Sequence, residues 1–87
     1  MANKVLIIDD DPDICLLMKR FLDKNGFEVD TAGNGEEAVD KLRKTMFDVA
    51  LLDYKLPDYS GLEILQKLRL LHNQIQVIII TGYSDLK

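Results

Sequence analysis

Apolar and polar residues follow two alternating patterns along the chain, one with the period of a strand and one with that of a helix. Short apolar or alternating runs predict strands over residues 4–8, 27–32, 48–53 and 76–81. Between these runs, apolar residues recur at helical spacing in three segments. The first predicted helix starts near Pro12 and stops before Asn25-Gly26, the second spans 34–46 and the third 62–71. The order βαβαβαβ predicts a parallel sheet with right-handed crossovers.

The helical spacing also predicts which side chains face the core. In the first helix the apolar face is expected to comprise Ile14, Leu17, Met18, Phe21 and Leu22, with Cys15 and Leu16 on the outward side. The second helix is expected to bury Ala38, Val39, Leu42 and Met46. The third is expected to bury Leu65, Leu68 and either Leu71 or His72. His72 ends this helix, so its simplest role is that of a partner for the C-terminal dipole. Glu37 and Lys41 are spaced as an i,i+4 ion pair on an exposed face.

Composition narrows the class of protein. A chain of 87 residues allows one small domain, and 47% hydrophobic with 30% charged residues is typical of a folded globular protein. No apolar run approaches the roughly 20 residues that span a bilayer. The net charge of −4 argues against direct nucleic acid binding by this chain. Its single cysteine, Cys15, cannot form an internal disulfide, and we therefore expect a reducing, cytoplasmic setting.

Acidic residues stand at the carboxyl ends of the predicted strands, where parallel sheets bind their ligands. Asp9 and Asp10 end the first strand, Asp53 ends the third, and Thr81 ends the fourth. Two carboxylates about 4 Å apart repel by roughly 4 kcal/mol at an effective dielectric of 20, so a cation should offset them. An all-oxygen ligand set favours Mg²⁺, and a carboxylate beside Mg²⁺ is a plausible nucleophile toward phosphorus.

Simpler roles compete for these acids. Asp11 and Asp13 could cap the first helix or pair with its dipole. Capping accounts for one carboxylate at the end of the first strand but not for both Asp9 and Asp10. Asp53 could cap a turn. The combination of acids on two strands favours a cation site over any one of these roles.

Three motifs carry a resemblance to a known family: "VLIIDDDPDI", "DVALLDYKLPDYSGLEIL" and "VIIITGYSD". Over all 87 residues, the chain resembles the receiver domain of bacterial response regulators, the phospho-accepting half of two-component signalling. The resemblance implies a flavodoxin-like, three-layer α/β fold. It also implies that Asp53 accepts a phosphoryl group from the phosphohistidine of a sensor histidine kinase, so the chain would be a signalling module and not an enzyme.

The resemblance assigns roles to further residues. Asp10 would bind Mg²⁺ directly, Asp9 would help through water, and the backbone carbonyl of Lys55 would be another ligand. Thr81 would be the switch hydroxyl that turns toward the phosphoryl group, and Gly82 the small neighbour that leaves access to it. Pro57 and Gly61 match the loop that follows the phospho-acceptor in the family.

Whole receivers have five βα units, whereas this sequence accounts for four strands and three helices. We therefore expect residues 1–87 to form a partial receiver that lacks the fourth helix, the fifth strand with its phosphoryl-pairing lysine, and the fifth helix. Lys87 follows Thr81 too closely to be that lysine. The fourth strand should then be a bare edge, and the chain should homodimerise through that strand or the uncovered sheet face. The remainder could include an output domain that binds DNA, because the motifs look most like those of enhancer-binding transcription activators.

Three functions remain open from the sequence. The first is a phospho-acceptor signalling module acting through Asp53. The second is a truncated, non-switching fragment that serves as a homodimerising structural module. The third is a metal-dependent phosphatase-like hydrolase, which is weaker because such enzymes carry a second Asp two residues after the nucleophile, where this chain has Lys55.

Overall fold

Four strands and three helices alternate along the chain, as the sequence predicts. The structure is a computed structural model that describes residues 3–53, 56–72 and 74–80. The elements are β1 (Lys4–Ile8), α1 (Pro12–Lys24), β2 (Glu28–Ala32), α2 (Gly35–Lys44), β3 (Val49–Asp53), α3 (Gly61–Leu71) and β4 (Gln76–Ile80). None of these described helices is long and apolar enough to cross a bilayer.

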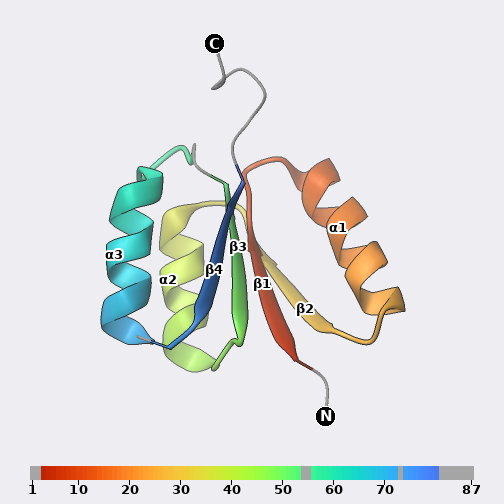
Figure 1. Cartoon of the computed structure of the whole chain (residues 1–87). Helices are drawn as coiled ribbons and strands as arrows, with labels where there is room; N and C mark the ends of the chain where they lie inside the picture. The colour runs from red at the N-terminus through yellow and green to blue at the C-terminus, as the bar shows by residue number, and fades with distance from the viewer. Residues whose placement is uncertain (1–2, 54–55, 73, 81–87) are drawn as a thin grey trace.

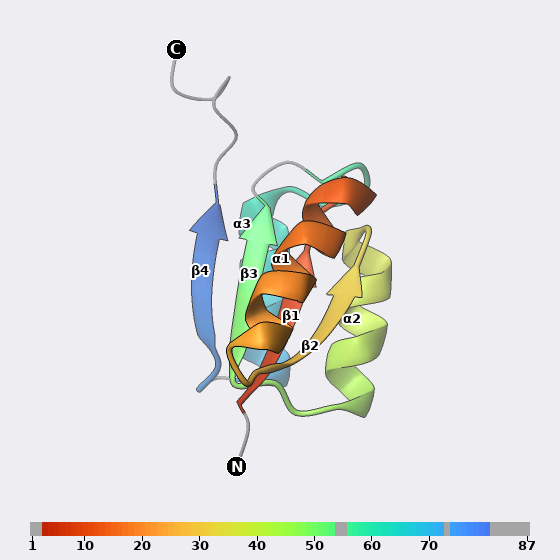
Figure 2. The ribbon, with the colours of Figure 1, turned by 90° about the vertical axis from the view of Figure 1, so that its right-hand side faces the viewer.

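The strands form one parallel sheet in the order β2-β1-β3-β4 (Figure 2). Helix α1 covers one face, and α2 and α3 cover the other, which gives three layers (Figure 1). This is the flavodoxin-like, three-layer α/β architecture that the resemblance implies. The chain leaves β1 toward β2 on one side and later returns to β3 on the other, so the topological switch point lies between β1 and β3. Open α/β sheets bind ligands at the carboxyl edge of that point.

The core has two layers because residues of the buried strands alternate between the faces of the sheet. Leu6 and Ile8 of β1 point into the layer shared with α2 and α3, where Leu52, Ile64 and Leu68 are also fully buried. On the α1 side, Val5 and Ile7 pack with Cys15. β1 is therefore covered on both faces, which makes its carboxyl end a rigid place from which to present side chains.

The predicted contact face of α1 is wrong in part. Cys15 is only 7% exposed and packs against the sheet, whereas Leu17 and Phe21 are 67% and 66% exposed. Met18 and Leu22 do contact this layer, and Leu16 is exposed as expected. The helix thus presents the stripe 15/18/22 to β1 and β2, while the other edge of its broad apolar surface remains exposed.

The second and third helices follow the prediction more closely. Ala38, Val39 and Leu42 of α2 are buried, but Met46 lies beyond the end of α2 at Lys44 and is exposed. The prediction for Met46 is wrong because the helix stops about two residues early. In α3, Leu68 is fully buried as expected.

Two features of α3 are not revealed by the sequence: its second buried residue and the contact made at its C-terminal end. Ile64 is the second fully buried residue of α3, while Leu65 is only half-buried and Leu71 packs on the margin of the core. Nε2 of His72 lies 2.5 Å from the carbonyl oxygen of Leu42. The side chain of His72 therefore contacts a C-terminal carbonyl of α2, while its backbone N–H caps its own helix by donating to the carbonyl oxygen of Leu68 at 2.8 Å.

The fourth strand is an exposed edge within the described part of the chain. β4 pairs with β3 through the register Ala50↔Val77 to Asp53↔Ile80. Val77 packs on the core, but Ile78, Ile79 and Ile80 are exposed. The predicted exposure of this strand is thus confirmed.

Candidate functional site

Strand register places the key acids side by side. Ile8 of β1 lies opposite Leu52 of β3, so the next residues, Asp9 and Asp53, are neighbours at the carboxyl edge. Asp10 follows directly. Carboxylate oxygens of Asp9, Asp10 and Asp53 all lie within 4.8 Å of one another. The structure thus brings together three of the residues that the sequence singles out.

The acid cluster is electrostatically strained. Asp9 is half-buried, and burial raises the pKa of its carboxyl group. The backbone N–H of Asp11 donates to Oδ1 of Asp9 at 2.9 Å and opposes this shift, but the negative charges of Asp53 and Asp10 raise the pKa further. Asp9 therefore binds a proton more readily than an ordinary aspartate, and a bound cation would relieve the same repulsion.

The cluster has the donor set and the spacing of a Mg²⁺ site. Octahedral Mg²⁺ holds oxygens at about 2.1 Å, which places neighbouring ligands about 3 Å apart and opposite ligands about 4.2 Å apart. The 4.8 Å limit of the Asp9, Asp10 and Asp53 oxygens is close to that span, and small side-chain rotations or one bridging water would close it. The residues present therefore fit this ion.

Asp11 has a structural role, as the capping alternative predicts. It is the N-cap of α1, and its Oδ1 accepts the backbone N–H groups of Asp13 at 2.9 Å and of Ile14 at 3.4 Å. Pro12 occupies the first turn and Asp13 lies within it, where a negative charge suits the helix dipole. This cap fixes the turn that carries Asp9 and Asp10.

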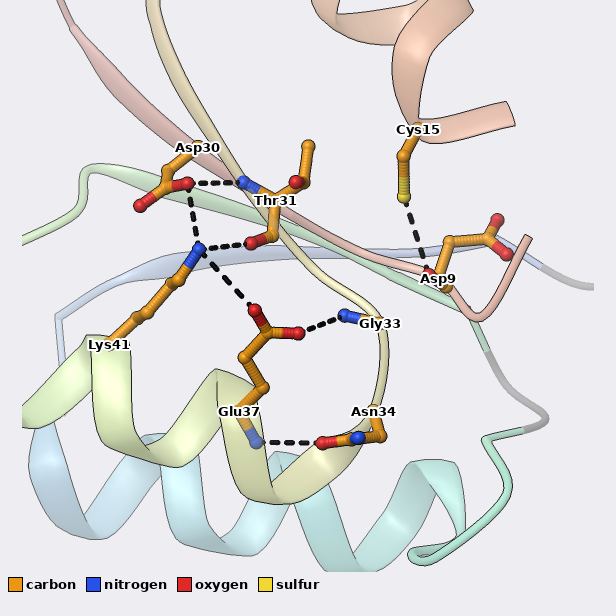
Figure 3. A network of polar contacts seen from close by, with 8 residues as sticks. All are labelled: Asp9, Cys15, Asp30, Thr31, Gly33, Asn34, Glu37 and Lys41. Atoms are coloured by element: carbon orange, nitrogen blue, oxygen red, sulfur yellow. Dashed lines mark hydrogen bonds and ion pairs between the residues drawn. The ribbon is translucent and has the colours of Figure 1, made fainter. Parts of the chain in front are cut away.

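An open hollow of about 390 Å³ lies beside the acids, lined by Asp9, Asp10, Pro12, Cys15, Leu16, Lys19, Thr31 and Gly33. Sγ of Cys15, one of the lining residues, lies 3.3 Å from the carbonyl oxygen of Asp9 (Figure 3). Burial raises the pKa of the Cys15 thiol, and the charge of Asp9 raises it further. Cys15 is therefore a neutral packing residue and a weak donor.

A polar network fastens the end of β2 to α2 (Figure 3). Nζ of Lys41 donates to Oδ1 of Asp30 at 2.9 Å and to the carbonyl oxygen of Thr31 at 2.6 Å. It also pairs with Glu37 at 3.6 Å, as predicted, and Glu37 in turn accepts the N–H of Gly33 at 2.7 Å. Burial favours a higher pKa for Asp30, but the hydrogen bonds from Lys41 and from the Thr31 N–H, together with the charge of Lys41, outweigh it and lower the pKa.

Sequence reasoning missed Asp58 and Gly35. Oδ1 of Asp58 accepts the N–H of Gly35 at 2.7 Å, and Oδ2 accepts the N–H of Glu36 at 3.0 Å. The available signals were an Asn-Gly pair before a helix and an acid in the loop after Asp53, but neither names the other as its partner.

The loop after Asp53 ends in a capping box that a local pattern does encode. The Ser60 hydroxyl accepts the N–H of Glu63 at 3.2 Å, and a Glu63 oxygen accepts the N–H of Ser60 at 3.0 Å. Gly61 is the buried first residue of α3, and Pro57 is exposed. Three predicted site residues, Lys55, Thr81 and Gly82, lie outside the described residues.

Comparisons with known proteins identify the family. The family model of the response regulator receiver domain matches residues 5–87. Sporulation initiation phosphotransferase F of Bacillus subtilis is 38% identical over 86 residues, which cover 99% of this chain and 69% of that protein. The transcriptional regulatory protein SrrA of Staphylococcus aureus is 37% identical over 85 residues, 98% of this chain but only 35% of SrrA.

Solved structures that resemble this chain point to the same family. A CheY-like receiver domain protein from Methanospirillum hungatei superposes with a TM-score of 0.92 at 37% identity, covering 95% of this chain and 66% of that one. The response regulator TrrA from Thermotoga maritima, solved in complex with Mg²⁺-BeF, superposes with a TM-score of 0.87 at 38% identity. The match covers 98% of this chain and 74% of that one. With this sheet order, this acid cluster and a family match over nearly its whole length, the chain belongs to the response regulator receiver domain family.

Proposed function

We propose that this chain is the phospho-acceptor module of a two-component response regulator and that Asp53 receives the phosphoryl group from a sensor histidine kinase. The observation that carries the proposal is the convergence of Asp53 with Asp9 and Asp10 at the switch point of the sheet. A cap or a turn gives no reason for three like charges to gather within 4.8 Å. A site that binds a cation and a phosphoryl group does.

The proposed reaction is a displacement at phosphorus. An oxygen of the Asp53 carboxylate attacks the phosphorus of phosphohistidine, the P–N bond breaks, and its electron pair returns to the imidazole, which takes up a proton. The product is an aspartyl phosphate, which water later hydrolyses to carboxylate and inorganic phosphate. The chain accepts one group in this scheme and is not an enzyme that turns over a substrate.

Asp9, Asp10 and Asp53 would hold the metal, together with the carbonyl of Lys55. Bound Mg²⁺ would neutralise charge on the phosphoryl oxygens as the group is transferred. The Mg²⁺-BeF complex of the related TrrA supports this assignment. The phosphoryl group would carry about −1.5 to −2 charges in place of the single negative charge of the carboxylate, and it would bring three acceptor oxygens. Thr81 would then turn toward those oxygens, with Gly82 leaving them accessible.

The proposed partners follow from the family and the exposed surface. The kinase would reach Asp53 at the open carboxyl edge, in the cytoplasm, where a reduced thiol such as Cys15 persists. Exposed apolar residues on β4 support a homodimer through that strand or the neighbouring sheet face, which sedimentation at several concentrations would detect. A DNA-binding output domain is a further proposed partner, in line with the similarity to the transcriptional regulatory protein SrrA.

The alternative, a non-switching structural module, requires the same fold but no acid cluster. The cluster of Asp9, Asp10 and Asp53 therefore favours the phospho-acceptor. A hydrolase of this kind would need a second Asp two residues after Asp53, and this chain has Lys55 at that position.

The test is the intact mass of the 87-residue chain after incubation with Mg²⁺ and acetyl phosphate. We expect a gain of one phosphoryl group, lost in Asp53→Asn and after chelation of Mg²⁺. Asp40→Asn removes a similar charge from an exposed position of α2 and should still be phosphorylated. A folded wild-type chain that gains no mass, or a gain that survives Asp53→Asn, would overturn the proposal.

A further inference from the structure

We propose that Asp58 is a positioning residue for the Asp53 site, because it fastens the segment after the phospho-acceptor to the first turn of α2. The inference rests on the proposed function, since it concerns the Mg²⁺ that Asp53 needs for phosphoryl transfer. It depends on two independent contacts between residues 56–60 and Gly35.

The first contact is a bidentate one. The two carboxylate oxygens of Asp58 accept the N–H groups of Gly35 and Glu36, at 2.7 and 3.0 Å. These belong to the first turn of α2, whose N–H groups have no partner within the helix. The side chain of Asn34 accepts the next one, from Glu37, at 2.8 Å. Asp58 thus completes a helix cap from more than 20 residues away and places a negative charge at the positive end of the dipole.

The pKa of Asp58 agrees with this geometry. The hydrogen bond from the Gly35 N–H holds the pKa of the Asp58 carboxyl below its ordinary value, and that from Glu36 adds to the effect. The contact therefore favours the ionised form, which is the form present at neutral pH.

The second contact is steric. A Cβ atom at Gly35 would lie 2.1 Å from Cδ2 of Tyr59 and 2.8 Å from Cδ1 of Ile64, so the ring can sit on the helix only because residue 35 is glycine. Nζ of Lys67 lies over the same ring, 5.4 Å from its centroid. Tyr59 is thereby held between α2 and α3.

Both ends of the connection are therefore anchored. Asp53 is fixed by its pairing with β4, and Asp58, Tyr59 and the capping box at Ser60 fix the far end. Between them, Leu56 packs on the core. Asp58 thus anchors the segment that leads away from Asp53, which is itself one of the three carboxylates of the acid cluster. Groups that orient a metal ligand from outside the coordination sphere commonly change affinity by about 10- to 100-fold when removed.

The experiment compares Asp58→Ala and Asp58→Asn with the control Asp40→Asn, all in the full 87-residue chain. Hydrogen exchange of the Gly35 and Glu36 amides reports on their hydrogen bonds to Asp58. An NMR titration of the Asp9 and Asp10 amides with MgCl₂ reports on the affinity for Mg²⁺. We expect Asp58→Ala to lose protection at both amides and to raise the Mg²⁺ concentration at half-saturation on the order of tenfold. Asp58→Asn keeps one acceptor oxygen and should lie between Asp58→Ala and the wild type, while Asp40→Asn should match the wild type.

Loss of protection at Gly35 and Glu36 with unchanged Mg²⁺ affinity would show that Asp58 only caps α2, and would overturn the inference. Unchanged protection of these two amides in Asp58→Ala would show that the hydrogen bonds to Asp58 do not form in solution, and would also overturn the inference. The proposed function fails separately, if the wild-type chain binds Mg²⁺ but gains no phosphoryl group. The two failures are therefore distinguishable, and because Asp58 is exposed, its variants should remain folded.

Discussion

Replacing Asp9 with asparagine should make the metal-free protein more stable. Asparagine keeps an oxygen to accept the N–H of Asp11 but removes one of three charges whose oxygens lie within 4.8 Å. At that distance, two unit charges repel by about 1 kcal/mol in water and by about 3.5 kcal/mol at a dielectric of 20. Because the cluster is open to solvent on one side, we expect a gain near the lower value, about 1 kcal/mol. In a domain of this size, that raises Tm by about 4–8 °C.

Mg²⁺ should make the wild-type protein more stable than Asp9→Asn, which reverses the order expected without the metal. At ten times its dissociation constant, a ligand stabilises the folded state by about 1.4 kcal/mol. The wild-type chain should gain this stabilisation, and Asp9→Asn should gain much less because it has lost a donor and a charge. Thermal unfolding followed by circular dichroism, with and without MgCl₂, measures both effects, and Asp40→Asn provides the control for charge.

The pH dependence supplies a further check on the same variant. The pKa of Asp9 is raised in the folded state, so its ionisation destabilises the fold only at pH values above the ordinary aspartate pKa of 3.8. The advantage of Asp9→Asn should therefore be greatest near neutral pH and vanish below that value. A variant that is less stable than the wild type without Mg²⁺ at neutral pH, or that responds equally to Mg²⁺, would refute the reasoning.

Three other substitutions test the packing and the polar network. Leu68→Ala removes a fully buried side chain and should cost about 2–5 kcal/mol in urea unfolding; a loss below 1 kcal/mol would contradict the packing described. Lys41→Gln should raise the pKa of Asp30 in an NMR titration and lower stability by no more than about 1 kcal/mol, since the pair is partly exposed. This loss should be present above the unfolded aspartate pKa and fade as the pH falls through the lowered pKa of Asp30; a pH-independent loss would contradict the ion pair. Gly35→Ala should cost about 1–3 kcal/mol, and less in a Tyr59→Ala background; equal costs in the two backgrounds would show that the ring is not the obstacle.

The order of the elements and the position of the acids were determined by the sequence alone. Periods of two and of 3.6 residues are local properties, so the seven elements were predictable to within a few residues. A βαβ order implies parallel strands, whose carboxyl ends meet at one edge, and this places Asp9, Asp10 and Asp53 together before any contact is known.

Only the tertiary structure decided which face of α1 meets the sheet and what holds the loop after Asp53. The apolar stripe of α1 is broader than its contact, so periodicity alone does not set the rotation that buries Cys15 and exposes Phe21. The Asp58 carboxylate accepts a hydrogen bond from the Gly35 N–H, although 23 positions separate the two residues in the sequence. Such a partner is selected by the packing of α2 beside α3 and has no local pattern, because the unpaired N–H groups of a helix N-terminus can donate to any acceptor that the fold brings near them.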